Sequence, residues 1–294
     1  MIPIRDLVNK ARIALEEKWG YIWGKSGQVW TQTNQDAATR DMTKRYGQKW
    51  VGKRVADCSG LFVFAFRENG GKIYHGSNTI WNEYLVPETR GALAGEIKIR
   101  YGSPVFQNVD GKRTHIGWYV GGGMVEEERG TQTGCILSPL ATWDEYGELK
   151  DADYTGEIYE TFDIQPLDTI TKGAKSELVK YLQNALREEG YDVGAAGADG
   201  AFGSGTLSAV RAFQHDNGLT PDGKVGQKTW AKIKALVTDD EPVEDKPEEA
   251  PEKTKKPTTN PEQDAWETLT LEEKVENLHK RLMRQEGGGQ IVNE

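Results

Sequence analysis

Apolar positions near the start of the chain recur at the spacing of a helix. Leu7, Ala11 and Ala14 lie one helical turn apart, and the pattern ends at Gly20. A second run of the same kind extends from Leu61 to Arg67. This periodicity predicts two helices in the first quarter of the chain.

The pattern changes to short apolar runs further along. Residues 116–120 and 134–137 are typical of strands, and a run of three glycines at 121–123 between them indicates a turn. Residues 25–56 contain another helical stretch, from Asp36 to Tyr46. Helices first and strands later favour an α+β fold over residues 1–163, in which helices pack on an antiparallel sheet.

Residues 168–238 carry helical spacing throughout and predict a small all-α bundle of three helices. They also contain an internal repeat, because residues 199–207 match residues 222–230. Each copy opens with Asp-Gly, which predicts a turn, and continues with an apolar residue that we expect to point inward.

Beyond this bundle the composition becomes acidic and rich in proline. Residues 239–264 hold five prolines, ten acidic residues and four lysines, which is typical of a disordered linker. Residues 265–286 then predict an amphipathic helix, with an apolar stripe over 271–282 at heptad spacing, and 287–294 form a tail. The stripe suits self-association or partner binding, and a fraying terminal helix is the equal alternative.

Net charge narrows the range of functions. The 294 residues carry a formal charge of −9, which argues against a protein that follows nucleic-acid phosphates. No apolar run is long enough to span a membrane, and no secretory signal is visible after Met1. We therefore expect synthesis in the cytoplasm.

Cys58 and His115 are the candidate chemical groups. Cys58 lies where a polar loop meets a helix, and such a position favours the thiolate. His115 begins the strand 116–120, so a sheet would fix its direction. A thiol and an imidazole arranged in this way are typical of thiol hydrolases.

Residues 57–62 (Asp-Cys-Ser-Gly-Leu-Phe) and 114–121 resemble the two motifs of the NlpC-like cell-wall peptidases, a papain-like family that cleaves peptidoglycan stem peptides. Residues 21–24 resemble the segment of that family whose Tyr lies beside the nucleophile. The resemblance implies a papain-like fold, with Cys58 as nucleophile, His115 as general base and Tyr21 beside Cys58. It implies no cofactor and no metal.

The third member of the triad is expected about twelve positions after the base, which is Glu127 here. The family commonly has His there, and Asn or Gln in some members. A carboxylate would orient the imidazole and stabilise its charged form. Since strands alternate faces, Glu126 and Glu128 would point the other way, and a solvated acidic edge is the alternative reading of all three.

Other residues leave alternatives open. Cys135 suits a core position, and a zinc site that includes it lacks the paired ligand spacing. Trp19, Trp23 and Trp30 could stack on sugar rings, although packing in a core is the commoner role.

Residues 168–238 resemble the three-helix peptidoglycan-binding module of wall hydrolases. The two resemblances together imply an enzyme that cuts an amide bond of the stem peptide and has a separable tether to bacterial peptidoglycan. The bond that the resemblance favours is the one between D-γ-glutamate and the diamino acid, and the N-acetylmuramoyl-L-alanine bond is the second choice. We expect a phage or prophage endolysin, released to act on the cell wall, and a toxin exported by a dedicated machine is the rival. The hypothesis from another class is a non-catalytic wall-binding or scaffold protein.

Overall fold

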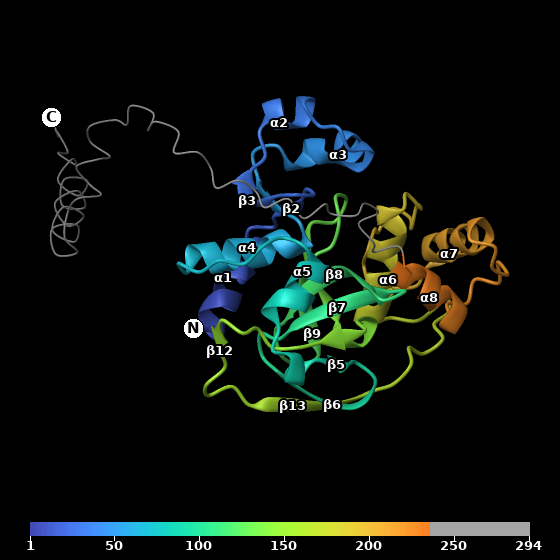
Figure 1. Ribbon diagram of the computed structural model, residues 1–294. Helices are drawn as coiled ribbons and strands as arrows, with labels where there is room; N and C mark the ends of the chain where they lie inside the picture. Colours follow the sequence, from blue (N-terminus) through green and yellow to red (C-terminus); the bar gives the residue numbers. More distant parts are fainter. Residues whose placement is uncertain (236–294) are drawn as a thin grey trace, which may run out of the picture. The chain divides into compact units, whose positions relative to one another are not determined.

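The computed structural model describes residues 1–235 (Figure 1). The predictions made for the linker at 239–264, the helix at 265–286 with its stripe at 271–282, and the tail at 287–294 lie outside the described residues.

A six-stranded sheet forms the centre of residues 1–163, and every neighbouring pair in it is antiparallel. Its order is β10-β9-β8-β7-β11-β5. The strands are β5 (Gly91–Ala92), β7 (Pro104–Val109), β8 (Lys112–Tyr119), β9 (Met124–Glu128), β10 (Cys135–Pro139) and β11 (Glu145–Tyr146). The predicted antiparallel sheet and its two strands after residue 115 are confirmed.

Two helices cover one face of this sheet (Figure 1). Helix α1 (Ile4–Glu16) buries the apolar positions that the periodicity singled out, and α4 (Cys58–Glu68) packs beside it. The ring of Phe62 stacks on Trp118 of β8, with centroids 3.8 Å apart. Both predicted helices are therefore present, and α4 rests on the face of β8 that carries Trp118.

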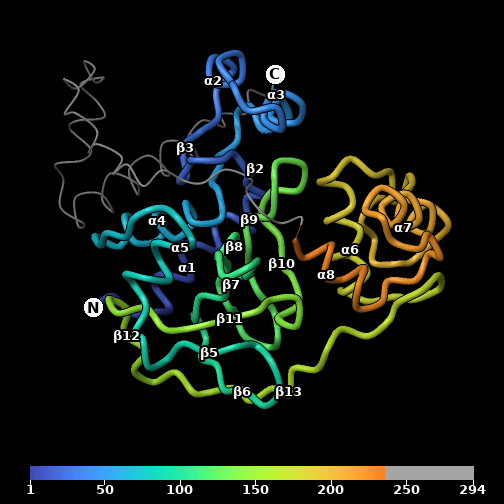
Figure 2. Tube along the Cα trace, turned by 45° about the vertical axis from the view of Figure 1, so that its right-hand side comes forward, coloured from blue at the N-terminus to red at the C-terminus, as the bar shows by residue number. Residues whose placement is uncertain are grey.

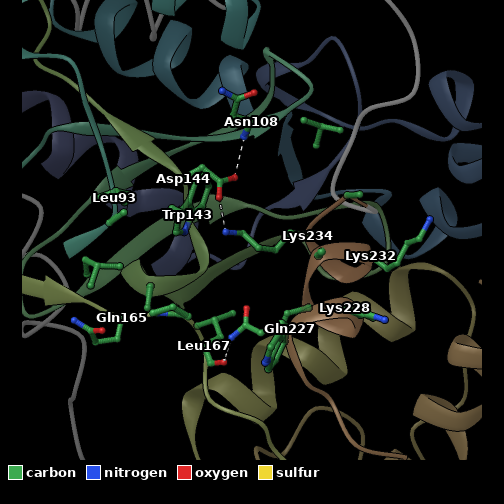
Figure 3. Close-up of a pocket in the computed structure, with 18 of the residues that line it drawn as sticks. Leu93, Asn108, Trp143, Asp144, Gln165, Leu167, Gln227, Lys228, Lys232 and Lys234 are labelled. Atoms are coloured by element: carbon green, nitrogen blue, oxygen red, sulfur yellow. Dashed lines mark hydrogen bonds and ion pairs between the residues drawn. The ribbon is translucent and has the colours of Figure 1, made fainter. Parts of the chain in front are cut away.

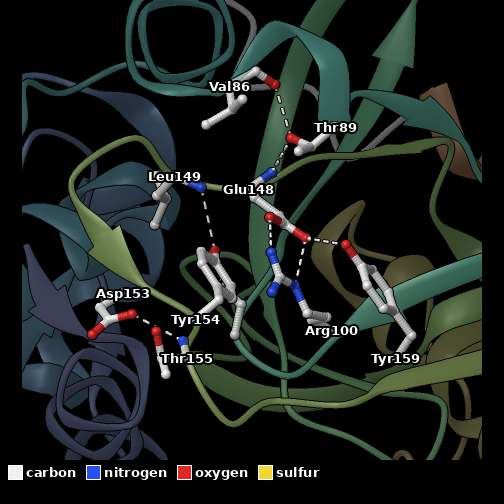
Figure 4. Close-up of polar contacts among 10 residues, drawn as sticks. Val86, Thr89, Arg100, Glu148, Leu149, Asp153, Tyr154, Thr155 and Tyr159 are labelled. Atoms are coloured by element: carbon white, nitrogen blue, oxygen red, sulfur yellow. Dashed lines mark hydrogen bonds and ion pairs between the residues drawn. The ribbon is translucent and has the colours of Figure 1, made fainter.

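The remaining strands form three smaller sheets, with the orders β1-β12, β13-β6 and β2-β4-β3. Their bounds are β1 (Ile2–Pro3), β2 (Gly20–Tyr21), β3 (Ser26–Val29), β4 (Arg54–Ala56), β6 (Gly95–Arg100), β12 (Ala152–Asp153) and β13 (Tyr159–Ile164). Figure 4 shows polar contacts beside the β13-β6 sheet. Arg100 at the end of β6 donates from Nε to Glu148 at 2.7 Å, and Tyr159 of β13 donates to the same carboxylate at 3.3 Å.

The segment at 25–56 corrects one prediction. The single helix expected from Asp36 to Tyr46 is two short helices, α2 (Gln32–Asp36) and α3 (Asp41–Tyr46). Arg40 has an extended backbone, with φ −73° and ψ 135°, which interrupts the helical hydrogen bonds. Gln35 explains the break, because its buried amide accepts from Trp30 and donates to the carbonyl of Thr43.

The remaining short elements are the helix α5 (Ser77–Thr79), the single-turn helices at Gly47–Trp50, Pro87–Thr89 and Leu140–Thr142, and a π-helical turn at Ile80–Tyr84.

Three helices with their own apolar core follow the sheet domain: α6 (Glu177–Glu188), α7 (Ser204–Asp216) and α8 (Gln227–Ala235) (Figure 2). The predicted turns are confirmed, since Gly200 and Gly223 both have a φ of +77°. Phe202 and Val225 are buried as the predicted inward-pointing residues.

A glutamine from the preceding helix closes each copy of the repeat. Gln183 and Gln214 each accept from a turn glycine at 2.8 Å and donate to the turn aspartate and to a buried threonine. Each threonine thus accepts a hydrogen bond from a glutamine side-chain amide. The repeat therefore extends to the two glutamines, which lie outside the matching sequence segments.

Candidate active site

Cys58 is the first residue of α4, and Asp57 caps that helix. One carboxylate oxygen of Asp57 accepts from the amide of Gly60 at 2.6 Å, and the other accepts from the amide of Gly24 at 2.6 Å. Asp57 therefore joins the segment at 21–24 to the start of α4. Gly60 is required here, because a Cβ on it would lie 1.9 Å from the carbonyl oxygen of Lys25.

Tyr21 lies in the strand beside this loop. In β2 it pairs with Ala56 of β4, two residues before Cys58, and its side chain is buried. The structure thus brings the Tyr21 segment and the Cys58 segment side by side.

His75 lies beside the start of α4, and sequence reasoning did not select it as a site residue. Its Nδ1 lies 3.6 Å from Asp57 and 3.4 Å from the hydroxyl of Ser59, the two residues that flank Cys58. Burial raises the pKa of Asp57, but hydrogen bonding and charge from His75, together with the amides of Gly60 and Gly24, hold it below its ordinary value. The carboxylate of Asp57 is therefore ionised, and the imidazole of His75 lies beside it.

His115 and Glu127 face each other from neighbouring strands. His115 lies on β8 and Glu127 on β9, and the imidazole Nε2 is 2.6 Å from a carboxylate oxygen of Glu127. The imidazole is 2% exposed and Glu127 is fully buried. The spacing of twelve residues therefore does bring a carboxylate to the imidazole, with the proton of Nε2 directed at it.

Glu127 remains ionised although it is buried. Burial raises its pKa, but the guanidinium of Arg129 and hydrogen bonds from His115 and Ser138 bring it below its ordinary value. Arg129 Nη1 lies 3.5 Å from the same oxygen that accepts from His115. An ionised partner can hold the imidazole in one tautomer.

Glu126 and Glu128 lie on the opposite face of β9, as alternation predicts, but they are as fully buried as Glu127. The reading of this run as a solvated acidic edge is therefore wrong. Burial raises the pKa of Glu126 to about 7, against a smaller effect of Arg12, and it raises that of Glu128 well above the usual range. Among the residues that the structure describes, no hydrogen bond reaches their carboxylate oxygens.

Cys135 pairs with Glu128 across β10 and β9 and is buried, so its predicted core position is confirmed. Burial, followed by the charges of the three glutamates, raises the pKa of this thiol well above its ordinary value. The raised pKa disfavours the thiolate form of Cys135, which is the reactive form of a thiol.

The two candidate groups, Cys58 and His115, are both buried. Cys58 belongs to the cluster of α4, Ile116 and Trp118, whereas the ring of His115 stacks on Trp143, with centroids 5.3 Å apart. The structure brings His115 to Glu127 and Cys58 to the Tyr21 segment. The pairing of Cys58 with His115, and every catalytic role, stays a prediction.

The tryptophans are largely accounted for by packing. Trp19 is 1% exposed and Trp30 is 5% exposed, so neither presents a face to a sugar. Trp23 is only partly buried, with the guanidinium of Arg40 4.4 Å from its ring centroid. Of the three, only Trp23 is left for stacking on a ligand.

A cavity of about 990 Å³ lies behind Trp143, between the sheet and α8 (Figure 3). Leu93, Trp143 and Trp230 contribute to its walls. Lys234 of α8 reaches Asp144 at 2.5 Å across it, and Asp144 also accepts from the amide of Asn108. These contacts join the three-helix bundle to the sheet.

Within residues 1–235, no helix is long and apolar enough to cross a membrane. No group of three or more His, Cys, Asp or Glu side chains in that range is arranged to hold a metal ion.

Comparison with protein families gives a match over the three-helix bundle. Residues 175–233 match the family described as "Putative peptidoglycan binding domain". These residues span α6, α7 and most of α8. The predicted resemblance of the bundle to a peptidoglycan-binding module is confirmed at this level.

Curated relatives are similar over short segments. An uncharacterised protein of Kitasatospora aureofaciens is 44% identical over 68 residues, which are 22% of this chain and 53% of that protein. The zinc D-Ala-D-Ala carboxypeptidase of Streptomyces albus G is 43% identical over 74 residues, 24% of this chain and 28% of that enzyme. The similar segments thus span about half of the first relative and about a quarter of the second.

Solved structures give similarly partial likenesses. The NlpC/p60 domain of the peptidoglycan hydrolase SagA is 14% identical, with a TM-score of 0.32, over 50% of this chain and 99% of that one. The N-terminal domain of SleB is 38% identical, with a TM-score of 0.23, over 24% of this chain and 94% of that one.

The sequence missed three residues that the structure links to the site: His75, Arg129 and Tyr181 of α6. Arg129 follows the glutamate run directly, and an arginine beside buried carboxylates could have been selected on charge grounds. His75 and Tyr181 lie far along the chain from the groups they approach, and only the fold brings them there.

Proposed function

We propose that this protein is a peptidoglycan hydrolase that cleaves an amide bond of the stem peptide with Cys58 as its nucleophile. The observation that carries the proposal is the buried pair of His115 and ionised Glu127, at 2.6 Å. The match of residues 175–233 to a peptidoglycan-binding family supports the choice of substrate.

The geometry of His115 indicates which nitrogen would act. Nε2 is directed at Glu127, so Nδ1 would accept the proton of the Cys58 thiol. The sulfur then attacks the amide carbon, and His115 returns the proton to the leaving amine as the C–N bond breaks. Glu127 stabilises the imidazolium between these two transfers.

The tetrahedral intermediate needs donors for its negative oxygen. The backbone amide of Cys58, at the N-terminus of α4, is the proposed donor, with Tyr21 from the neighbouring strand assisting. A water molecule, deprotonated by His115, then hydrolyses the thioester and releases the carboxylic acid and the free thiol. No cofactor is needed for either half of this reaction.

We infer that the scissile bond is the one between D-γ-glutamate and the diamino acid, with the N-acetylmuramoyl-L-alanine amide as the second choice. The resemblance of residues 57–62 and 114–121 to NlpC-like motifs supports this order. Mass spectrometry of digested wall fragments distinguishes the two bonds, because they leave different N-terminal residues.

A non-catalytic wall-binding protein is the second candidate. The observation that favours it is the match of residues 175–233 to a peptidoglycan-binding family, which is a binding module and not a catalytic one. In that case the sheet domain would serve as a recognition surface beside the bundle.

Amine release from purified peptidoglycan separates these functions. Cys58→Ala should lower the rate at least about a thousandfold, as loss of a nucleophile does elsewhere. Cys135→Ala is the matched control, because it removes the buried thiol and should leave the rate unchanged. A wild-type protein that pellets with walls and releases no amines would leave the binding function as the better account.

We place the activity at the cell wall, in the lysis stage of a phage or prophage. Expression together with a membrane-perforating protein should lyse the host, and the Cys58→Ala variant should not. Lysis by both variants would contradict this setting.

A further inference from the structure

Helix α6 of the three-helix bundle reaches the residues beside the His115 and Glu127 pair. Tyr181 projects from α6 and is 2% exposed. Its hydroxyl accepts from the side-chain amide of Gln107 at 3.0 Å. Gln107 pairs directly with His115 across β7 and β8. Gln107 therefore links Tyr181 to the strand position that pairs with His115.

The ring of Tyr181 also covers Arg129. The guanidinium carbon lies 4.2 Å from the ring centroid, which is a favourable cation–π distance. Arg129 is 4% exposed, so water does little to solvate its charge. Tyr181 and the carboxylates of Glu127 and Glu188 are the groups that stabilise this cation.

A second set of contacts fixes the loop that carries Arg129. Glu188, the last residue of α6, accepts from the amide of Gln132 at 2.9 Å. The Gln132 side chain in turn donates to the carbonyl of Arg187. The helix also packs closely on Gly130, since a Cβ there would lie 2.7 Å from Glu188. Helix α6 thus holds both the arginine and its loop.

Arg129 in turn controls the charge of Glu127. After the opposing effect of burial, its guanidinium is the leading influence that lowers the pKa of Glu127. If Arg129 moved away, the carboxylate would become harder to ionise in its buried position. The hydrogen bond from His115 Nε2 would then weaken.

We propose that Tyr181 is a positioning residue for the active site, so that α6 completes the peptidase rather than only tethering it. This inference rests on the proposed function for the role of His115. It contradicts the expectation of a separable tether, because removal of the bundle would also free Arg129.

The test compares Tyr181→Leu with Tyr181→Phe. Leu removes the ring from Arg129, whereas Phe keeps the ring and loses the hydroxyl, with its bond to Gln107 and its own interaction with Arg129. Tyr191→Leu is the matched control, because Tyr191 packs against Phe213 within the bundle and pairs with Asp216. Thermal unfolding and pelleting with cell walls check that each variant folds and still binds.

The first readout is the proton NMR signal of the imidazole Nε2–H, which a short bond to a carboxylate shifts downfield and protects from exchange. His115→Gln assigns it. We expect Tyr181→Leu to lose the signal, Tyr181→Phe to keep it, and Tyr191→Leu to keep it. A folded Tyr181→Leu variant that retains the signal would overturn the proposal.

The second readout is cleavage of a soluble muropeptide, which does not depend on tethering. Tyr181→Leu should lower kcat about tenfold or more and move the acid limb of the pH profile upward, as the pKa of Glu127 rises. Unchanged kcat and an unmoved limb in a folded variant would also overturn it. If the wild type cleaves nothing, the proposed function fails, and the NMR signal still decides whether Tyr181 positions the pair.

Discussion

The two faces of strand β9 shift the pKa of a buried glutamate in opposite directions. Glu127 is buried beside Arg129, His115 and Ser138, and it is ionised. Glu126 and Glu128, its immediate neighbours, are equally buried, and their pKa values are raised. Burial alone therefore does not decide the charge of a carboxylate, and the partners on its face of the sheet do.

The partners differ because the two faces pack against different elements. The Glu127 face meets Trp143 and, through Arg129, helix α6. The other face lies near α1, where Arg12 Nε is 3.9 Å from Glu126, and near the buried thiol of Cys135. A strand with three consecutive glutamates thus supplies one anion and two carboxyl groups that burial makes harder to ionise.

The largest expected effect comes from Glu127→Gln. The amide cannot stabilise an imidazolium, so cleavage of peptidoglycan should fall by roughly 10³ to 10⁴. Glu128→Gln is the matched control, one position away on the other face, and it should retain most of the rate. Equal losses in both variants would remove the distinction between the faces.

Glu128→Gln should instead change stability with pH. The raised pKa of Glu128 means that the folded protein holds this proton while the unfolded chain loses it near pH 4.5, so stability falls as pH rises above that value. The variant lacks this loss and should be more stable than wild type at pH 8, and equal to it at pH 4. Urea unfolding followed by tryptophan fluorescence measures the difference, and a variant that is less stable at pH 8 would contradict it.

Glu126→Gln should also make the protein more stable than the wild type at high pH, but the difference should develop over a narrower pH range. Its pKa rises from 4.5 to about 7, so the loss develops between those values and is complete above them. At pH 8 the free energy of unfolding of the variant should therefore exceed that of the wild type by about 3 kcal/mol. A gain that continues to grow well above pH 7 would show that another group titrates.

Arg12→Gln should have the smallest effect. Arg12 lies 3.9 Å from Glu126 and its side chain is 39% exposed, so solvent screens much of the interaction. Loss of this charge should destabilise the protein at neutral pH by less than about 1 kcal/mol. Added salt should reduce the difference between variant and wild type, and a difference that is unchanged in 1 M salt would argue for packing instead.

Local patterns predicted the main helices and two of the strands. Helices α1 and α4 and the three helices of the bundle follow from apolar spacing, and the glycines at 200 and 223 follow from Asp-Gly turns. The break between α2 and α3 was missed, because it depends on a contact of Gln35 with the carbonyl of Thr43. Such a contact leaves no periodic signal.

The candidate site divides in the same way. The sequence by itself selected the candidate residues, because Cys58 at a helix start, His115 on a strand and Glu127 at the offset of the resembling family can all be found along the chain. Only the tertiary structure decided that the pKa of Glu127 is lowered while those of its neighbours are raised, and that His75 and Tyr181 approach the site. The physical reason is that ionisation depends on solvation and on nearby charges, and packing of distant segments sets both.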